Sequence, residues 1–146
     1  MLCENFPKTI AGVKDSSGDL DHSLKLASRF PDIAIFPGNE THLLATLEKG
    51  CAGCISATAN ANPYGIRKIF DSCLSGDTSA HALQDQAFAI REMFGRHPLV
   101  SALKQHAAWS TGDDTWLRLR PPLHPLDEGA AAILRSDLDA LAVAPR

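Results

Sequence analysis

The sequence contains no apolar run long enough to span a membrane, and its first ten residues, MLCENFPKTI, lack the apolar centre of a signal peptide. It also lacks an excess of one charge, since 14 Lys and Arg are scattered among 17 Asp and Glu. We therefore expect no nucleic-acid partner, no membrane partner and a cytoplasmic location. The 146 residues, 45% apolar and 21% charged, instead predict an ordinary soluble domain with a real core.

Cysteine is scarce, and only two of the 4 cysteines are closely spaced. Cys51 and Cys54 lie in GCAGCISATAN, which has the pattern of a strand entered from a glycine turn. Residues three apart on a strand point to opposite faces, so the two thiols should diverge. The chain has no second such pair to complete a tetrahedral zinc site. We favour small, reduced core cysteines, and a metal or redox role is the alternative.

Three apolar runs, at residues 9–13, 33–36 and 51–56, have the composition of buried strands. Segments with helical spacing lie between them, at residues 20–30 and 41–49. This order and its spacing of about twenty residues predict right-handed βαβ units and a parallel sheet covered on both faces. Three parallel strands cannot close a barrel, and an open sheet of this kind leaves edges unpaired. The chain therefore has the pattern of part of a larger structure.

The pattern changes after the third strand, and the carboxyl half is all helix. One helix starts at the cap Asn62 and closes at Gly76. Further helices are predicted at residues 77–94, 98–112 and 127–142. We therefore divide the chain into an α/β segment at residues 1–76 and a helical extension at residues 77–146.

Lys14 is the candidate for chemistry, because it follows the apolar run TIAGV at the carboxyl end of a predicted parallel strand. In α/β folds the ligand crevice lies at that end of the sheet. A lysine attacks a ketone only as an uncharged amine, and the usual cause of neutrality is desolvation. Gly12 and Val13 are the neighbours expected to supply it. The alternative is a lysine that ends a strand simply by reaching water.

Three motifs, IAGVKDSSGD, FPGNE and GCAGCISATANANP, resemble in order and spacing the last three strands of the dihydrodipicolinate synthase and N-acetylneuraminate lyase superfamily. These proteins are class I pyruvate-type aldolases built on a (β/α)₈ barrel. HPLVSALKQ and LRLRPPLHPLD resemble the helical extension that follows that barrel. The resemblance implies an α/β fold: the last three βα units of a TIM barrel, with an all-helical extension.

The resemblance also implies roles for particular residues. Lys14 matches the lysine that forms a Schiff base with pyruvate or a 2-keto-3-deoxy acid, with no metal or organic cofactor. The other matched residues are expected to bind substrate. They are the loop residues Gly38, Asn39 and Glu40, which contact its distal part, Ile55, whose backbone lines the pyruvate pocket, and Ser56, which meets a substrate hydroxyl. The alternatives are purely structural roles: Gly38 forms a turn, and Ser56 caps a strand.

Two features of the family are missing here: the Thr-Thr loop that holds the pyruvate carboxylate and the tyrosine that relays protons. Tyr64, the only tyrosine, does not match the relay position. We expect an incomplete enzyme, completed by a chain that supplies the missing barrel half or present as a homo-oligomer. A truncated, non-catalytic fragment or helical oligomerisation module is the alternative. Asp15, where the dihydrodipicolinate branch carries glutamate, argues against that branch. The KDSSGD form resembles members that cleave a 2-keto-3-deoxy sugar acid or 4-hydroxy-2-oxoglutarate, and Glu40 and Ser56 would suit such a hydroxylated substrate.

Overall fold

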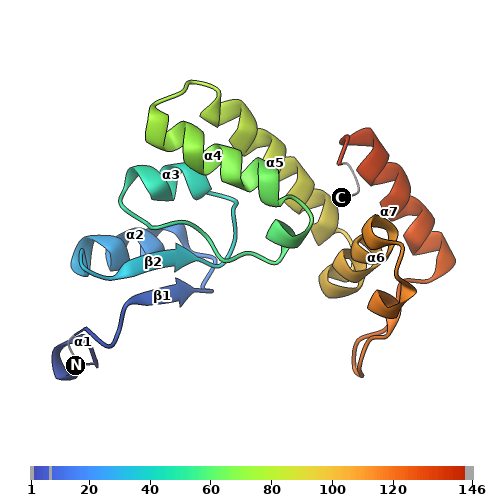
Figure 1. Cartoon of the computed structure of the whole chain (residues 1–146), viewed down its shortest axis with the longest axis horizontal. Coiled ribbons are helices and arrows are strands. Elements are labelled where there is room, and N and C mark those ends of the chain that lie inside the picture. Colours follow the sequence, from blue (N-terminus) through green and yellow to red (C-terminus); the bar gives the residue numbers. More distant parts are fainter. Residues whose placement is uncertain (1, 7, 144–146) are drawn as a thin grey trace.

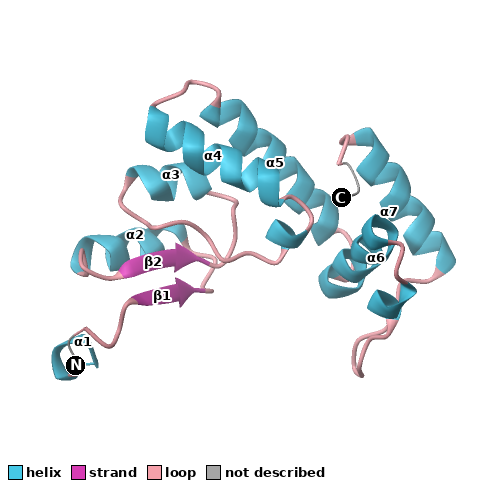
Figure 2. Cartoon of the chain, viewed as in Figure 1, coloured by secondary structure: helices cyan, strands magenta, loops and turns pink. Residues whose placement is uncertain are grey.

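The computed structural model describes residues 2–6 and 8–143. A small parallel sheet lies near the amino-terminal end, and helices dominate the remainder (Figures 1 and 2). The elements in chain order are α1 (Leu2–Asn5), β1 (Gly12–Asp15), α2 (Leu20–Arg29), β2 (Ala34–Pro37), α3 (Leu43–Glu48), η1 (Thr58–Asn60), α4 (Pro63–Ser75), α5 (Ala80–Gly95), α6 (Leu99–Thr111), η2 (Asp114–Leu117) and α7 (Glu128–Ala140). None of the helices in this described part is long and apolar enough to cross a membrane.

The sheet consists of β1 and β2, which run parallel with Lys14 opposite Phe36. The connecting helix α2 covers one face of this sheet (Figure 2). On that face Ile35 of β2 packs with Ala27 of α2 and with Cys51. The first strand–helix–strand unit therefore confirms the parallel arrangement predicted from the sequence.

The third predicted strand, at residues 51–56, is not a strand, although it runs beside β2. It makes two bonds to β2: Ala52 N–H donates to the Ile35 carbonyl at 2.8 Å, and Ile55 N–H to the Pro37 carbonyl at 3.0 Å. A regular parallel ladder would return an N–H from residue 37 to Ala52, but proline has none. Gly53, at φ 148°, adds an extra residue between the two bonds. The prediction overlooked both interruptions.

Side chains cap the first turns of α2 and α4, and the cap of α4 is the predicted Asn62. Asp19 at the start of α2 and Asn62 at the start of α4 each accept a hydrogen bond from a backbone N–H three residues along the chain. α4 and α6 end at Gly76 and Gly112, whose φ angles of 70° and 67° cost glycine little. Helices are therefore observed where they were predicted, in both halves of the chain.

The core links the α/β segment to the helices that follow it. Leu43 of α3 and Ile69 of α4 pack in one cluster with Ala87 of α5. A second cluster joins α5 to α6 and α7 through residues that include Phe94 and Leu134. In Figure 1, α4 and α5 lie side by side as an antiparallel pair beyond α3. Helix α5 therefore shares a core both with the sheet-bearing segment and with the last helices.

The outer edge of β1 is unpaired. The Gly38 N–H donates to the Asp15 carbonyl at 2.6 Å, so the backbone polar groups of Asp15 face β2. Neighbouring residues of a strand direct theirs to opposite edges, so Gly12 and Lys14 face away from β2. Among residues 2–6 and 8–143 the sheet has two strands only, and nothing pairs with that edge. An edge of this kind is a template for a further strand.

Candidate active site at the carboxyl ends of the strands

Lys14 lies in β1, one residue before its carboxyl end, and its side chain is exposed. Gly12 is also exposed, and Val13 is 38% exposed. The expectation that these two neighbours would desolvate the amine is therefore wrong for this chain. Successive residues of a strand point to opposite faces, so Lys14 points away from the face on which Asp15 meets Ser23 of α2. In the described residues β1 is also an edge strand, with no further strand beside it.

Phe36 stands opposite Lys14 in the sheet register, and its ring lies between two glycines. A Cβ atom added at Gly12 would lie 3.4 Å from the Phe36 ring, and one added at Gly53 would lie 3.7 Å from it. A side chain at either position would therefore make an ordinary van der Waals contact with the ring. Phe36, Gly53 and Cys54 line an apolar pocket whose other side is formed by α4, including Phe70.

Asp15 anchors the turn that follows Lys14, and its side chain points to the covered face. Its carboxylate accepts hydrogen bonds from the Ser23 hydroxyl at 2.6 Å and the Ser17 N–H at 3.0 Å, and lies 3.0 Å from Nδ1 of His22. Burial by itself raises the pKa of Asp15, but the hydrogen bonds from Ser23, His22 and Ser17 outweigh it and hold that pKa well below its usual range. The Ser-Ser-Gly-Asp turn is thus fixed by a charged group beneath it.

Gly38 lies where the loop after β2 passes close to the end of β1. A Cβ atom at this position would lie 2.9 Å from the Asp15 carbonyl oxygen and 3.0 Å from the Ser16 Cα. Both of those atoms belong to the backbone, so a side chain would force the two loops apart. The absence of a side chain at Gly38 therefore allows the loops after β1 and β2 to approach each other closely. The next residue, Asn39, accepts a hydrogen bond from the Thr41 N–H at 3.0 Å.

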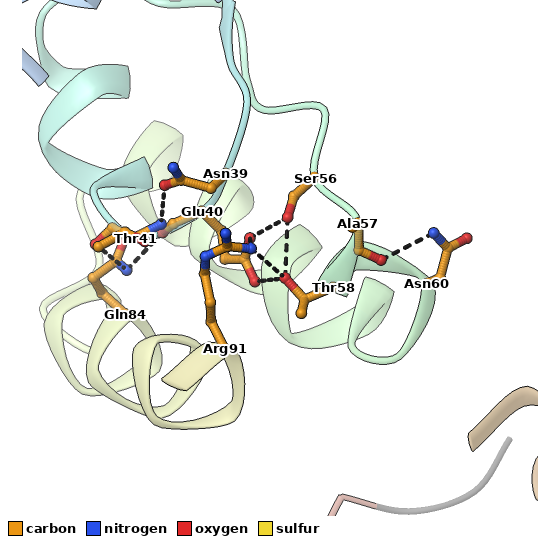
Figure 3. Close-up of polar contacts among 9 residues, drawn as sticks. All are labelled: Asn39, Glu40, Thr41, Ser56, Ala57, Thr58, Asn60, Gln84 and Arg91. Carbon is orange, nitrogen blue, oxygen red and sulfur yellow. Dashed lines mark hydrogen bonds and ion pairs between the residues drawn. The ribbon is translucent and has the colours of Figure 1, made fainter. Parts of the chain in front are cut away.

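Glu40 is the centre of a buried polar network, drawn in Figure 3. Its side chain is only 1% exposed, and its two carboxylate oxygens accept hydrogen bonds from the hydroxyls of Ser56 and Thr58. Nη1 of Arg91, from α5, lies 3.8 Å from the Glu40 Oε2 and donates to the Thr58 hydroxyl at 3.3 Å. A buried carboxylate needs such hydrogen bonds and a counter-charge to offset its desolvation.

Gln84, also from α5, holds the backbone of the same loop (Figure 3). Its Nε2 donates to the carbonyls of Glu40 at 2.9 Å and Thr41 at 3.2 Å. Its Oε1 accepts from the Leu44 N–H at 2.9 Å, which caps the first turn of α3. Helix α5, within the predicted helical extension, therefore fixes both the backbone and the side chain of a candidate site residue.

The predicted site residues fall into two groups. Glu40 and Ser56 are in direct contact, although sixteen residues separate them. Gly38 joins them to the end of β1, and Ile55, 47% exposed, bonds through its N–H to β2. Lys14 lies at the open edge of β1 instead.

Sequence reasoning missed Thr58, Gln84 and Arg91. The available signal was spacing, since Gln84 and Arg91 occur on the same helical stripe as Ala80 and Ala87. Polar residues at positions expected to be apolar mark a buried polar contact.

The two closely spaced cysteines lie in different environments. Cys51 belongs to the cluster beneath α2, whereas Cys54 packs against the α3–α4–α5 cluster. Burial, reinforced by the charge of Glu40 and opposed by Arg91, raises the pKa of Cys54 to about 11. Burial, with a smaller contribution from Asp15, also raises the pKa of Cys51. Both thiols are thus protonated at neutral pH, and the described residues contain no group of three or more potential metal ligands.

Comparisons with known proteins agree with the motifs. A model of the dihydrodipicolinate synthetase family matches residues 2–141. A curated relative, an uncharacterized DapA-like lyase from Chloroflexus aurantiacus, is 37% identical over 125 residues, which make up 86% of this chain and 41% of that protein. The chain thus spans less than half the length of this relative.

Solved structures show the same partial coverage. YagE from E. coli K12, a member of the dihydrodipicolinic acid synthase family crystallised with pyruvate, matches with a TM-score of 0.80 and 27% identity, over 92% of this chain and 47% of that one. The 4-hydroxy-tetrahydrodipicolinate synthase from Methylacidiphilum fumariolicum SolV matches with a TM-score of 0.83 and 24% identity, over 97% of this chain and 47% of that one. The second likeness shows the fold alone.

Proposed function

The chain belongs to the dihydrodipicolinate synthetase family, and from that premise we propose that it is the lysine-bearing part of a Schiff-base lyase acting on pyruvate or a 2-keto-3-deoxy acid. The observation that carries this proposal is the family match over residues 2–141, which includes Lys14 near the carboxyl end of β1. Ligands of barrel and open-sheet α/β folds bind at that end of the strands. The proposed architecture is the last three βα units of a (β/α)₈ barrel.

In the proposed reaction the neutral amine of Lys14 adds to the keto carbon, and the resulting carbinolamine takes up a proton and loses water to give an iminium ion. In the synthetic direction, loss of a proton from the adjacent carbon gives an enamine, which attacks an aldehyde and forms the carbon–carbon bond. In the cleavage direction the substrate hydroxyl gives up its proton, the iminium nitrogen accepts the electron pair of the breaking bond, and an aldehyde leaves an enamine behind. The enamine then takes up a proton on carbon to give the iminium ion again, and water releases the keto acid and restores the amine.

The proposed binding residues surround the ends of the strands. Asn39 and Glu40 follow β2, and the exposed Ile55 and partly buried Ser56 end the segment beside it. We propose that Ile55 lines the keto-acid pocket and that the loop at Gly38 lies towards the distal part of the substrate. The tight contact of this loop with the end of β1 supports that placement.

Lys14 also requires an enclosure that the described residues do not provide, because the edge and side of β1 are open. We propose that further barrel strands cover it, either from a chain that supplies the missing half or within a homo-oligomer. The exposure of Lys14 also supports a second candidate function, in which no enclosure is needed. In that case the chain is non-catalytic, and the helices of residues 77–146 mediate association between chains.

The two functions are separated by trapping the imine. The protein is incubated with pyruvate, reduced with borohydride and digested, and the peptides are weighed. The first function predicts a mass gain at Lys14 equal to pyruvate less one water plus two hydrogens. Lys14→Met should abolish the gain, whereas Lys25→Met, which replaces an exposed lysine of α2, should not. A folded protein with no adduct at Lys14 between about pH 6 and 9, a range over which a desolvated lysine becomes neutral, supports the second function.

A further inference from the structure

The side chain of Gln84 matches three backbone groups of the segment that leads from β2 into α3. Its Oε1 accepts the Leu44 N–H at 2.9 Å. Its Nε2 donates to the carbonyls of Glu40 at 2.9 Å and Thr41 at 3.2 Å (Figure 3). A backbone N–H can only donate and a carbonyl can only accept, so one orientation of the planar amide satisfies all three groups. A carboxylate, an ammonium or a thioether at this position would satisfy only part of the set.

The loop of residues 38–42 belongs to neither β2 nor α3. Its start is fixed by the close contact of Gly38 with the end of β1, and its end by the first turn of α3. Between these two points the carbonyls of Glu40 and Thr41 face α5, where Gln84 bonds both. The backbone of the middle of the loop therefore takes its course from a side chain outside the loop.

Helix α5 presents a rigid support to this loop. Ala87 packs in an apolar cluster with Leu43 of α3, which fixes the helix against the segment that follows the loop. The partly buried Gln84 lies about one turn before Ala87, on the same side of the helix. Arg91, about one turn further on, reaches the Glu40 carboxylate. A single helix thus holds the loop through its backbone and through its buried side chain.

We infer that Gln84 is a positioning residue for the distal part of the substrate and acts through the backbone of Glu40 and Thr41. The inference rests on the proposed function for its premise that the loop at Gly38 lies towards that part. The keto end of the acid lies at Lys14, on β1, which Gln84 does not hold. Long keto acids therefore depend on Gln84 and pyruvate does not, and α5 takes part in substrate selection as well as in packing.

The test compares pyruvate, which has no distal part, with 2-keto-3-deoxygluconate, which has a hydroxylated one. Borohydride labelling of Lys14 is measured over a range of concentrations of each acid. We expect Gln84→Met to raise the half-saturating concentration of the longer acid about tenfold and that of pyruvate less than about twofold, with the limiting rate of labelling unchanged. Gln86→Met, which replaces an exposed glutamine of the same helix, should change neither value.

Gln84→Glu separates the bonds to the loop from the bond to α3. A glutamate keeps an oxygen for the Leu44 N–H but places an oxygen, in place of the amide nitrogen, against the carbonyls of Glu40 and Thr41. We expect it to weaken binding of the longer acid at least as much as Gln84→Met does. If Gln84→Glu behaves like the unsubstituted protein, the bonds to the two carbonyls do not matter and the inference is overturned.

The outcomes separate the inference from the proposed function. Equal weakening of both acids by Gln84→Met, or no weakening of either, overturns the inference and leaves the Schiff base standing. If neither acid labels Lys14 in the unsubstituted protein, the proposed function fails. Binding is then followed by NMR titration of the Thr41 amide in the Lys14→Met protein. Weaker binding of the longer acid after Gln84→Met in that background supports the inference, and unchanged binding or no binding overturns it.

A second measurement needs no substitution. The side-chain amide protons of Gln84, which bond two carbonyls, should exchange with solvent more slowly than those of the exposed Gln86 in NMR spectra of the unsubstituted protein. Slower exchange at Gln84 supports the inference. Equal exchange at the two glutamines overturns it, because the side chain would then not hold the loop in solution.

Discussion

Replacing Arg91 by methionine tests whether the helical segment stabilises the candidate site electrostatically. The Arg91 Nη1 lies 3.8 Å from a Glu40 carboxylate that is 1% exposed, and the Arg91 side chain is 27% exposed. At 3.8 Å and an effective dielectric constant of about 20, Coulomb's law gives an attraction of about 4 kcal/mol. Residual solvent contact lowers that figure, and the lost hydrogen bond to Thr58 partly restores it.

We therefore expect Arg91→Met to lower the free energy of unfolding by about 2–4 kcal/mol, because it leaves a buried carboxylate without its cation. Urea unfolding followed by circular dichroism measures this change. In a Glu40→Gln background, the same substitution should cost only about 1 kcal/mol, since a neutral amide needs no counter-charge.

The matched control is Arg67→Met. Arg67 pairs with Asp71 at 2.7 Å on α4, but the two side chains are 68% and 53% exposed. Exposed ion pairs at this helical spacing contribute little to stability, so we expect almost no change in the free energy of unfolding. The reasoning is refuted if Arg91→Met is no more destabilising than Arg67→Met, or if its cost is the same with glutamine at position 40.

Two further predictions concern Asp15, at the end of β1, and Gly38, in the loop that packs against that end. Asp15→Asn should lower the free energy of unfolding by about 1–3 kcal/mol at neutral pH. Because folding lowers the pKa of Asp15, its contribution to stability is complete above the unfolded pKa of about 4 and is lost as the pH falls towards the folded value. Urea unfolding at several pH values should therefore show the free energies of unfolding of the unsubstituted and Asp15→Asn proteins converging in acid. A constant difference down to pH about 2, well below the unfolded pKa, would contradict this. Gly38→Ala should lower the free energy of unfolding by about 1–3 kcal/mol, because the Cβ atom of the alanine would meet backbone atoms. Thermal unfolding measures this change. Gly95→Ala, with open space around it, should cost nothing, and equal effects at the two glycines would rule out the steric argument.

The helices and the first two strands were predictable because their signals are local. Asp19 and Asn62 cap the helices that follow them, and Gly76 ends α4. The third strand was mispredicted because its backbone depends on its neighbour. The sequence of residues 51–56 favours a strand, but Pro37 of β2 lacks the N–H that would complete the ladder.

The candidate site was predictable only in part. The motifs identified Glu40 and Ser56 separately, but their contact requires the chain to fold across sixteen residues. Arg91 reaches the same group from α5, thirty-three residues beyond Thr58. Helical spacing could have marked Arg91 as a polar residue on the stripe of Ala80 and Ala87, but it could not have indicated which buried group the guanidinium pairs with.

The sequence by itself determined the identity of the family, the order of the helices and the position of Lys14 near the end of a strand, because these depend on short-range patterns and motifs. Only the tertiary structure decided that Lys14 is exposed, since exposure depends on which strands lie beside β1. It also decided that Glu40 is buried and engaged with Ser56 and Thr58. Hydrogen bonds and burial between distant segments arise only when the chain is folded.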